Sequence, residues 1–206
     1  MAHIPDGVLG APVLITGATV TAGLLVIALR RLDYDRLPQT AVLAAAFFVS
    51  SLISIPLGPS SVHLLLNGLM GLLLGWLAVP ALAVALLLQA VFFGFGGIVV
   101  LGVNTMNMAL PALICAALLR GQFLHASLNG LFWIGVAAGA AGVLLTAFAV
   151  AASLGLSGKP FVPAAEAMIL IYLPLAAVEA LITGVILRFL GRVAPELIRD
   201  PEPSHA

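Results

Sequence analysis

The chain has 206 residues, of which 63% are hydrophobic and 8% are charged, and its formal net charge is zero. Soluble globular domains carry about 25% charged residues, so this composition excludes a soluble domain and indicates an integral membrane protein in contact with the lipid bilayer. The lack of net positive charge argues against nucleic acid as a partner. A single cysteine, Cys115, excludes a disulfide framework and argues against a thiolate metal cluster.

The first apolar stretch, residues 11–29, is preceded by an acidic residue, Asp6, and by no basic residue. A secretory signal would carry positive charge there and would have a shorter apolar region, so we expect this stretch to remain as a membrane span. Arg30 and Arg31 follow it at once. The positive-inside rule therefore predicts an N-terminus outside the membrane.

Further apolar runs follow along the chain, and they are continuous rather than alternating. Helices satisfy their own backbone hydrogen bonds in lipid over such runs, whereas a β-barrel needs short segments of alternating polarity. We therefore expect an all-α integral membrane fold of about seven transmembrane helices, over residues 11–29, 38–57, 62–79, 81–95, 104–119, 131–153 and 164–190.

With the N-terminus outside, seven of the eight basic residues fall on the inner side, and Lys159 alone falls outside. This asymmetry supports the seven-span count and predicts a cytoplasmic C-terminus. The expected organisation is a single membrane domain over 1–206, in a multi-pass protein of the cell (inner) membrane. It consists of an extracellular hook (1–10), a helical bundle (11–190) and a cytoplasmic tail (191–206).

The hook begins MAHIPDG and carries groups that bind metals. If Met1 is removed, as happens before small residues such as Ala2, His3 becomes the second residue. The terminal amine, the next backbone amide and the imidazole Nδ1 can then hold one metal in a plane, and His63 could supply a fourth nitrogen. If Met1 is retained, a free amine, two amides and His3 complete the plane without His63. A solvated terminal histidine is the simplest alternative.

Glycines interrupt the helical pattern in GFGGIVVLGVN. Irregular backbone at membrane depth is tolerated where protein buries it or where it lines a cavity, so Gly96 and Gly97 are candidates for supporting a site. Asn104 and Asn107 follow, three residues apart on one helical face, and could orient the histidines or the hook. An ordinary amide contact between helices is the alternative for both.

Two acidic residues complete the set of candidates. Glu179 lies in the middle of the last apolar segment, where a carboxylate is costly and is a functional candidate by default. It could lock the bundle or belong to a polar pathway, and both interpretations stay open. Asp6, between Pro5 and Gly7, predicts a turn that folds the hook back over the bundle.

The blocks that carry these residues resemble the CbiM/NikM family, the substrate-binding membrane components of energy-coupling-factor (ECF) cobalt and nickel importers. The resemblance covers nearly the whole chain, and rests on HIPDGVL, GPSSVHLLLNGLMGLLLGW, GGIVVLGVNTMNMALPA and LPLAAVEALITGVILRFLGRVAPEL, in that order. The family begins Met-His, whereas Ala2 intervenes here. Phe95 stands at a position where the family often has a polar residue.

The resemblance implies that the chain carries Ni(II) or Co(II), bound at the outer face by nitrogen ligands in a plane. Ala2 and His3 resemble the amine donor and the first histidine ligand, His63 resembles the second, and Asn104 and Asn107 resemble the polar residues under the site. No cofactor besides the transported ion is implied. The implied partners are a transmembrane coupling subunit and two ATPase subunits, and a small accessory membrane protein is a further candidate partner. Because ATP hydrolysis belongs to the separate ATPase subunits, the chain itself is expected not to be an enzyme.

Two other classes of protein compete with this interpretation. A vitamin-binding component of the same importer type would need a roomy aromatic pocket, yet 7% of the residues are aromatic and the histidine hook would have no role. An intramembrane hydrolase could use Ser60 or Ser61 with His63, but these residues share one short segment without an evident oxyanion arrangement.

Overall fold

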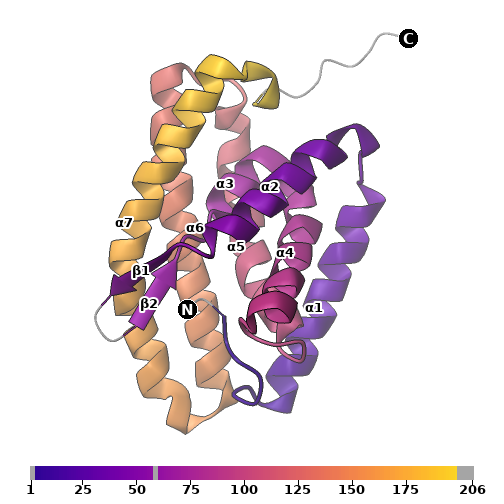
Figure 1. The fold of residues 1–206 in the computed structure, drawn as a ribbon, viewed down its shortest axis with the longest axis vertical. Coiled ribbons are helices and arrows are strands. Elements are labelled where there is room, and N and C mark those ends of the chain that lie inside the picture. Colours follow the sequence, from indigo (N-terminus) through magenta and orange to yellow (C-terminus); the bar gives the residue numbers. More distant parts are fainter. Residues whose placement is uncertain (1–2, 58–59, 199–206) are drawn as a thin grey trace.

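The computed structural model describes residues 3–57 and 60–198, and of residues 54–57 and 60–62 it describes the backbone alone. The described chain contains short 3₁₀ turns (η1 Tyr34–Arg36, η2 Gly75–Leu77, η3 Lys159–Phe161, η4 Pro195–Leu197). Its main elements (Figure 1) are seven α-helices and a pair of antiparallel strands: α1 Ala11–Arg30, α2 Leu37–Ser50, β1 Ser54–Leu57, β2 Ser60–His63, α3 Asn67–Leu74, α4 Ala78–Phe93, α5 Leu101–Phe123, α6 Leu128–Ser157 and α7 Val162–Val193.

Five helical stretches of the described chain are long and apolar enough to cross a membrane, and they make it a multi-pass membrane protein. These stretches are α1, α5, α6, the α3–α4 unit Asn67–Phe93 and the η3–α7 unit Lys159–Val193. The expected helical membrane fold is confirmed, but residues 3–57 and 60–198 contain five candidate spans rather than the expected seven. Helix α2 has 14 residues, or about 21 Å, against a hydrocarbon core of about 30 Å. Helix α3 has 8 residues, and all of them are buried.

The helices expected over 38–57 and 62–79 were wrong at the C-terminal end of the first and at the N-terminal end of the second, where the structure has strands instead. The hydroxyls of Ser50 and Ser51 donate to the carbonyls of Phe47 and Phe48, and α2 stops there. The chain then turns into β1 and β2, whose register pairs Ser54 with His63. Both apolar runs were long enough for helices, but serines that bond to the preceding turn and Pro56, which lacks an N–H, favour leaving the helix.

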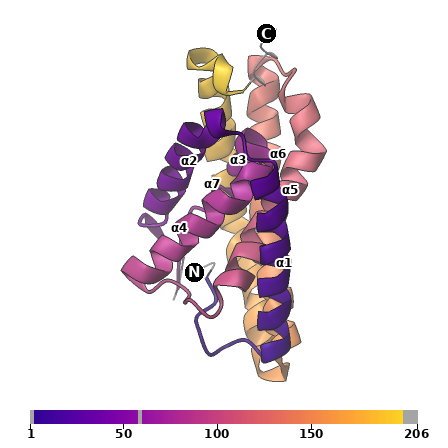
Figure 2. The same ribbon diagram turned by 90° about the vertical axis from the view of Figure 1, so that its right-hand side faces the viewer.

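Apart from the β1–β2 pair, the connections between helices lie toward two ends of the bundle (Figures 1 and 2). These two ends differ in charge. The hook end holds the start of α1, the segment 94–100 and the η3 turn with Lys159. The opposite end, here called the arginine end, holds the end of α1, the α3–α4 junction and the α5–α6 connection. The described arginines belong to the elements that begin or end there: Arg30, Arg31, Arg36, Arg120, Arg188 and Arg192.

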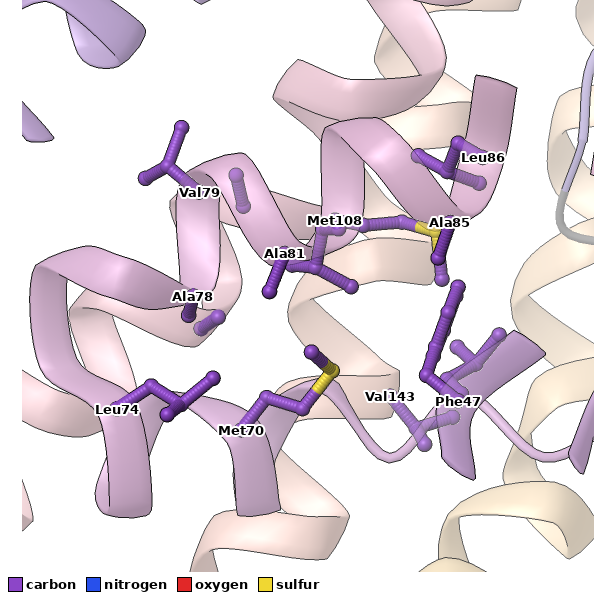
Figure 3. Close-up of a cluster of buried hydrophobic side chains, with 14 of the residues drawn as sticks. Phe47, Met70, Leu74, Ala78, Val79, Ala81, Ala85, Leu86, Met108 and Val143 are labelled. Carbon is purple, nitrogen blue, oxygen red and sulfur yellow. The ribbon is translucent and has the colours of Figure 1, made fainter. Parts of the chain in front are cut away.

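Helix α3 is the centre of the bundle and packs against α5 and α6. Figure 3 shows Met70 and Leu74 of α3 facing a cluster that includes Phe47, Leu86 and Met108 from three other helices. Helices α6 and α7 approach each other through glycine, since a Cβ added at Gly139 would lie 2.5 Å from the Glu179 carbonyl oxygen. This packing fixes the position of α3, whose first residue, Asn67, comes four residues after His63.

Candidate metal centre

The described structure brings together the two histidines that the sequence singled out. His3 lies in the hook and His63 ends β2, yet their Nε2 atoms are 3.0 Å apart. The rings lie nearly parallel, with centroids 5.0 Å apart and an interplanar angle of 22°. Both side chains are buried, at 6% and 4% exposure, so the solvated alternative for His3 is wrong.

The hydrogen bonds of His63 determine which of its two ring nitrogens carries the proton and which can accept a hydrogen bond. Its Nδ1 lies 2.9 Å from the Leu64 carbonyl oxygen, which can only accept, so Nδ1 carries the proton. The Nε2 lone pair therefore faces His3, whose Nε2–H donates to it. A metal-binding histidine usually has this arrangement, with one nitrogen donating to a carbonyl and the other nitrogen turned to the metal.

Burial also sets the charge of the pair. Desolvation and the neighbouring His63 lower the pKa of His3 from 6.5 to about 3. Burial lowers the pKa of His63 as well, against a smaller opposing effect of its bond to Leu64. Both imidazoles are consequently neutral at pH 7, and the neutral imidazole is the form that binds a metal ion.

Asn104 holds the hook in place with both ends of its amide. Its Oδ1 accepts from the Ile4 N–H at 3.1 Å, and its Nδ2 donates to the Ile4 carbonyl at 3.1 Å. Gly96 allows this close approach, because its φ is +76° and a Cβ there would lie 2.7 Å from Asn104 Nδ2. Asn104 and Gly96 therefore hold the backbone of Ile4, the residue that follows His3.

A second attachment lies further along the hook. The Asp6 Oδ1 accepts from the Val100 N–H at 3.0 Å, where α5 is about to begin. A Cβ at Gly97 would collide with the Asp6 carboxylate, so this position has room for glycine alone. Gly7 has a φ of +86° and forms the turn that Asp6 was expected to start. The expected turn is present, and the capping contact of Asp6 with α5 was missed.

The Glu179 side chain forms hydrogen bonds with the backbone of the segment that follows His63. Its carboxylate is 1% exposed and accepts from the N–H groups of Leu65 and Leu66, the latter at 3.1 Å and 3.2 Å from its two oxygens. Leu66 has a φ of +47°, a conformation that leucine rarely adopts. The carboxylate thus satisfies backbone donors just before α3, two and three residues after His63, and these are the contacts that a locking role requires.

Asn107 does not share the role of Asn104. It lies one turn further along α5, and its Oδ1 accepts from the Ser153 hydroxyl on α6 at 3.2 Å. This contact matches the alternative interpretation of Asn107, in which its side-chain amide makes an ordinary contact between two helices.

Asn67 is a supporting residue that the sequence reasoning missed. Its Nδ2 donates to the Thr146 hydroxyl at 2.8 Å and lies 3.3 Å from the Met108 carbonyl oxygen, which ties the start of α3 to α5 and α6. An asparagine inside the apolar run LLLNGLM was the available signal. Phe95 stacks on the His3 ring, with the two ring centroids 6.1 Å apart, so its apolar side chain covers a face of His3.

The remaining predicted ligand lies outside the described part of the chain. Ala2, the expected amine donor, is one of the residues whose structure is not described. Within residues 3–57 and 60–198, no cluster of three or more His, Cys, Asp or Glu side chains could hold a metal. Further donors to an ion at this pair would therefore come from backbone nitrogen, from the hook terminus or from water. The side chains of Ser60 and Ser61, named for the hydrolase alternative, are likewise not described.

Removing the Asn104 amide is expected to release the hook. In Asn104→Ala the buried N–H and carbonyl of Ile4 lose their partners, which costs about 1–3 kcal/mol and corresponds to roughly 5–150-fold faster hydrogen exchange at the Ile4 amide. Hydrogen–deuterium exchange of the detergent-solubilised chain measures this. Asn129→Ala, at an exposed position of α6, is the matched control and should leave the hook unchanged. Equal exchange in both variants would contradict the clamp.

The chain is similar to known proteins that are named for metal transport. A family model described as CbiM, cobalt uptake substrate-specific transmembrane region, matches residues 3–197. A Haemophilus influenzae protein named for metal transport is 38% identical over 205 residues, covering 97% of this chain and 98% of that protein. The fused nickel transport protein NikMN of Rhodobacter capsulatus is 34% identical over 222 residues, covering 95% of this chain and 63% of that protein.

The fold has a match among solved structures. The crystal structure of a truncated transition metal transporter superposes with a TM-score of 0.74 at 26% identity, covering 91% of this chain and 97% of that one. These relatives are named as transport proteins and not as enzymes, so the hydrolase alternative has no support. The chain belongs to the CbiM family, whose members are the substrate-specific transmembrane regions of cobalt uptake systems.

Proposed function

We propose that this chain captures Ni(II) or Co(II) at the hook end and delivers it inward as the substrate-binding component of an ECF-type importer. The coupling subunit and the ATPase subunits would be separate chains, and a small accessory membrane protein is a further candidate partner. The observation that carries the proposal is the buried, neutral pair of His3 and His63, with facing Nε2 atoms 3.0 Å apart.

The spacing of the two nitrogens supports a metal ion as the ligand. Bonds between a transition metal and imidazole nitrogen are about 2.0–2.1 Å long, and two ligands at 90° in a square plane are then about 2.9 Å apart. The separation of 3.0 Å is close to this value. An ion bound to both Nε2 atoms would replace the proton that they share, and the proton of His3 would move to its Nδ1 so that both Nε2 lone pairs are available.

The proposed ligand set is His3, His63 and the amine of Ala2 after removal of Met1. Chelation together with the amine would use Nδ1 of His3, whereas it is Nε2 that faces His63 in the structure. Such a chelate therefore requires the His3 ring to rotate when the metal binds. Without that rotation, the two Nε2 atoms form one side of the plane and backbone or water ligands complete it.

The proposed orientation places the hook end outside and the arginine end in the cytoplasm. Six described arginines lie at one end, and Lys159 alone lies at the other, which under the positive-inside rule favours a cytoplasmic arginine end. In this orientation the hook (1–10) is extracellular, the bundle (11–190) crosses the membrane and the tail (191–206) is cytoplasmic. The ion would then be captured from the outer solution.

Native mass spectrometry of the purified full chain, offered equal concentrations of nickel and cobalt, tests the proposal. We expect one bound ion on a chain that lacks Met1, and the bound mass identifies the preferred metal. A metal-bound chain that retains Met1 would move the site to the N-terminus and remove His63 from the ligand set. A processed chain that binds neither ion would overturn metal capture and favour an organic substrate.

A further inference from the structure

Three guanidinium groups converge at the arginine end on the residues that close α3. The Arg36 Nη2 donates to the Leu73 carbonyl at 2.6 Å, and the Arg31 Cζ lies 4.8 Å from the centroid of the Trp76 ring. Arg120 approaches Gly75 so closely that a Cβ there would collide with its Nη1. These arginines come from η1, the end of α1 and α5, so the fold concentrates positive charge from three separate elements.

An apolar groove begins beside this cluster. It has a volume of about 680 Å³ and runs over α5 next to α1, with Gly75, Trp76 and Arg120 at the charged end. Its walls are aliphatic, formed by Leu24, Leu110, Leu113, Ile114, Ala116 and Ala117. Helices α1 and α5 are both candidate membrane spans, and Ile114 is 41% exposed on the outer face of α5. The groove is therefore open toward lipid rather than toward the core of the bundle.

The chemistry of the groove matches a membrane phospholipid with a net negative charge. An acyl chain suits the aliphatic walls, and a phosphate suits guanidinium groups at the level where the span ends. Trp76 adds an aromatic ring of the kind that sits at the membrane interface. The described residues that line the groove include no acidic side chain, so nothing among them would repel a phosphate.

We propose that this groove binds an anionic phospholipid, with its acyl chain along α1 and α5 and its phosphate between Arg31 and Arg120. The site is separate from the histidine pair at the hook end and does not depend on metal binding. Arg36 holds the Leu73 carbonyl and shapes the end of α3, while Arg31 and Arg120 provide the charge beside Trp76.

The test uses the full-length chain in nanodiscs of phosphatidylcholine with increasing phosphatidylglycerol, followed by native mass spectrometry of the retained lipid. We expect the wild type to retain phosphatidylglycerol at least about fivefold over phosphatidylcholine, and the double variant Arg31→Gln, Arg120→Gln to lose that preference. Arg188→Gln, which removes an exposed arginine of α7 at the same end, is the matched control and should keep it.

A second variant tests the groove without changing the charge. Ala117→Phe fills the apolar wall and should reduce retention of phosphatidylglycerol while both arginines remain. Circular dichroism checks that each variant is folded. Equal retention of the two lipids by the wild type, or the same loss in Arg188→Gln as in the double variant, would overturn the proposal. Competition by soluble glycerol phosphate would also overturn it, because the acyl chain would then contribute nothing.

Discussion

His63→Ala is expected to abolish binding of Ni(II) and Co(II) while the chain stays folded. The substitution removes the lone pair that faces Nε2 of His3 at 3.0 Å, and one hook histidine cannot supply both nitrogens. Loss of a residue that only orients a ligand costs about 10–100-fold in metal affinity, so loss of a ligand should cost roughly 100-fold or more. Equilibrium dialysis of detergent-solubilised protein against each ion measures this.

The chain offers a matched control for that experiment. His125 is exposed, its Nδ1 lies 3.1 Å from the Gly121 carbonyl oxygen, and it sits at the opposite end of the bundle. His125→Ala should bind metal like the wild type. His3→Ala should match His63→Ala if the two rings share one ion. Unchanged affinity in His63→Ala, together with loss in His3→Ala, would show that the N-terminus binds the ion alone.

The sequence indicated which residues the structure brings together at the candidate site better than it indicated their contacts. His3, His63, Asn104, Gly96 and Gly97 could be named because metal-binding, amide and glycine residues stand out in an apolar chain. Their pairing depends on segments up to 100 residues apart, such as the bond from Ile4 to Asn104. No local spacing carries that information, and only the folded bundle sets it.

The β1–β2 pair shows where pattern alone was insufficient. An isolated two-stranded pair is marginally stable in water, and short apolar strands cannot be distinguished from helical segments by periodicity. Here the backbone after β2 is held by Glu179, and the segment beyond it by Asn67. A hydrogen bond from a backbone N–H to the Glu179 side chain requires no particular residue type at the position that donates. The sequence around His63 therefore did not indicate this bond, and the strand that carries His63 was interpreted as part of a helix.

Glu179 offers the sharpest test of how the bundle supports the site. Glu179→Leu leaves the buried N–H groups of Leu65 and Leu66 without their acceptor, and each unpaired donor costs about 1–3 kcal/mol of the free energy of unfolding. Thermal unfolding should occur at a clearly lower temperature. Because these donors lie two and three residues beyond His63, we also expect metal affinity to fall by roughly 10–100-fold.

Glu179→Gln separates a locking role from a place on an ion pathway. The glutamine oxygen can still accept from the N–H groups of Leu65 and Leu66. If Glu179 has a locking role, the metal affinity and the stability of Glu179→Gln should therefore lie between those of Glu179→Leu and those of the wild type. A carboxylate that passes the ion inward predicts wild-type affinity and stability with loss of transport in reconstituted vesicles. Glu166→Gln, at an exposed position of the same helix, controls for removal of a charge from α7. We expect the first outcome, because both carboxylate oxygens already accept from the Leu66 N–H, close to the strand that carries His63.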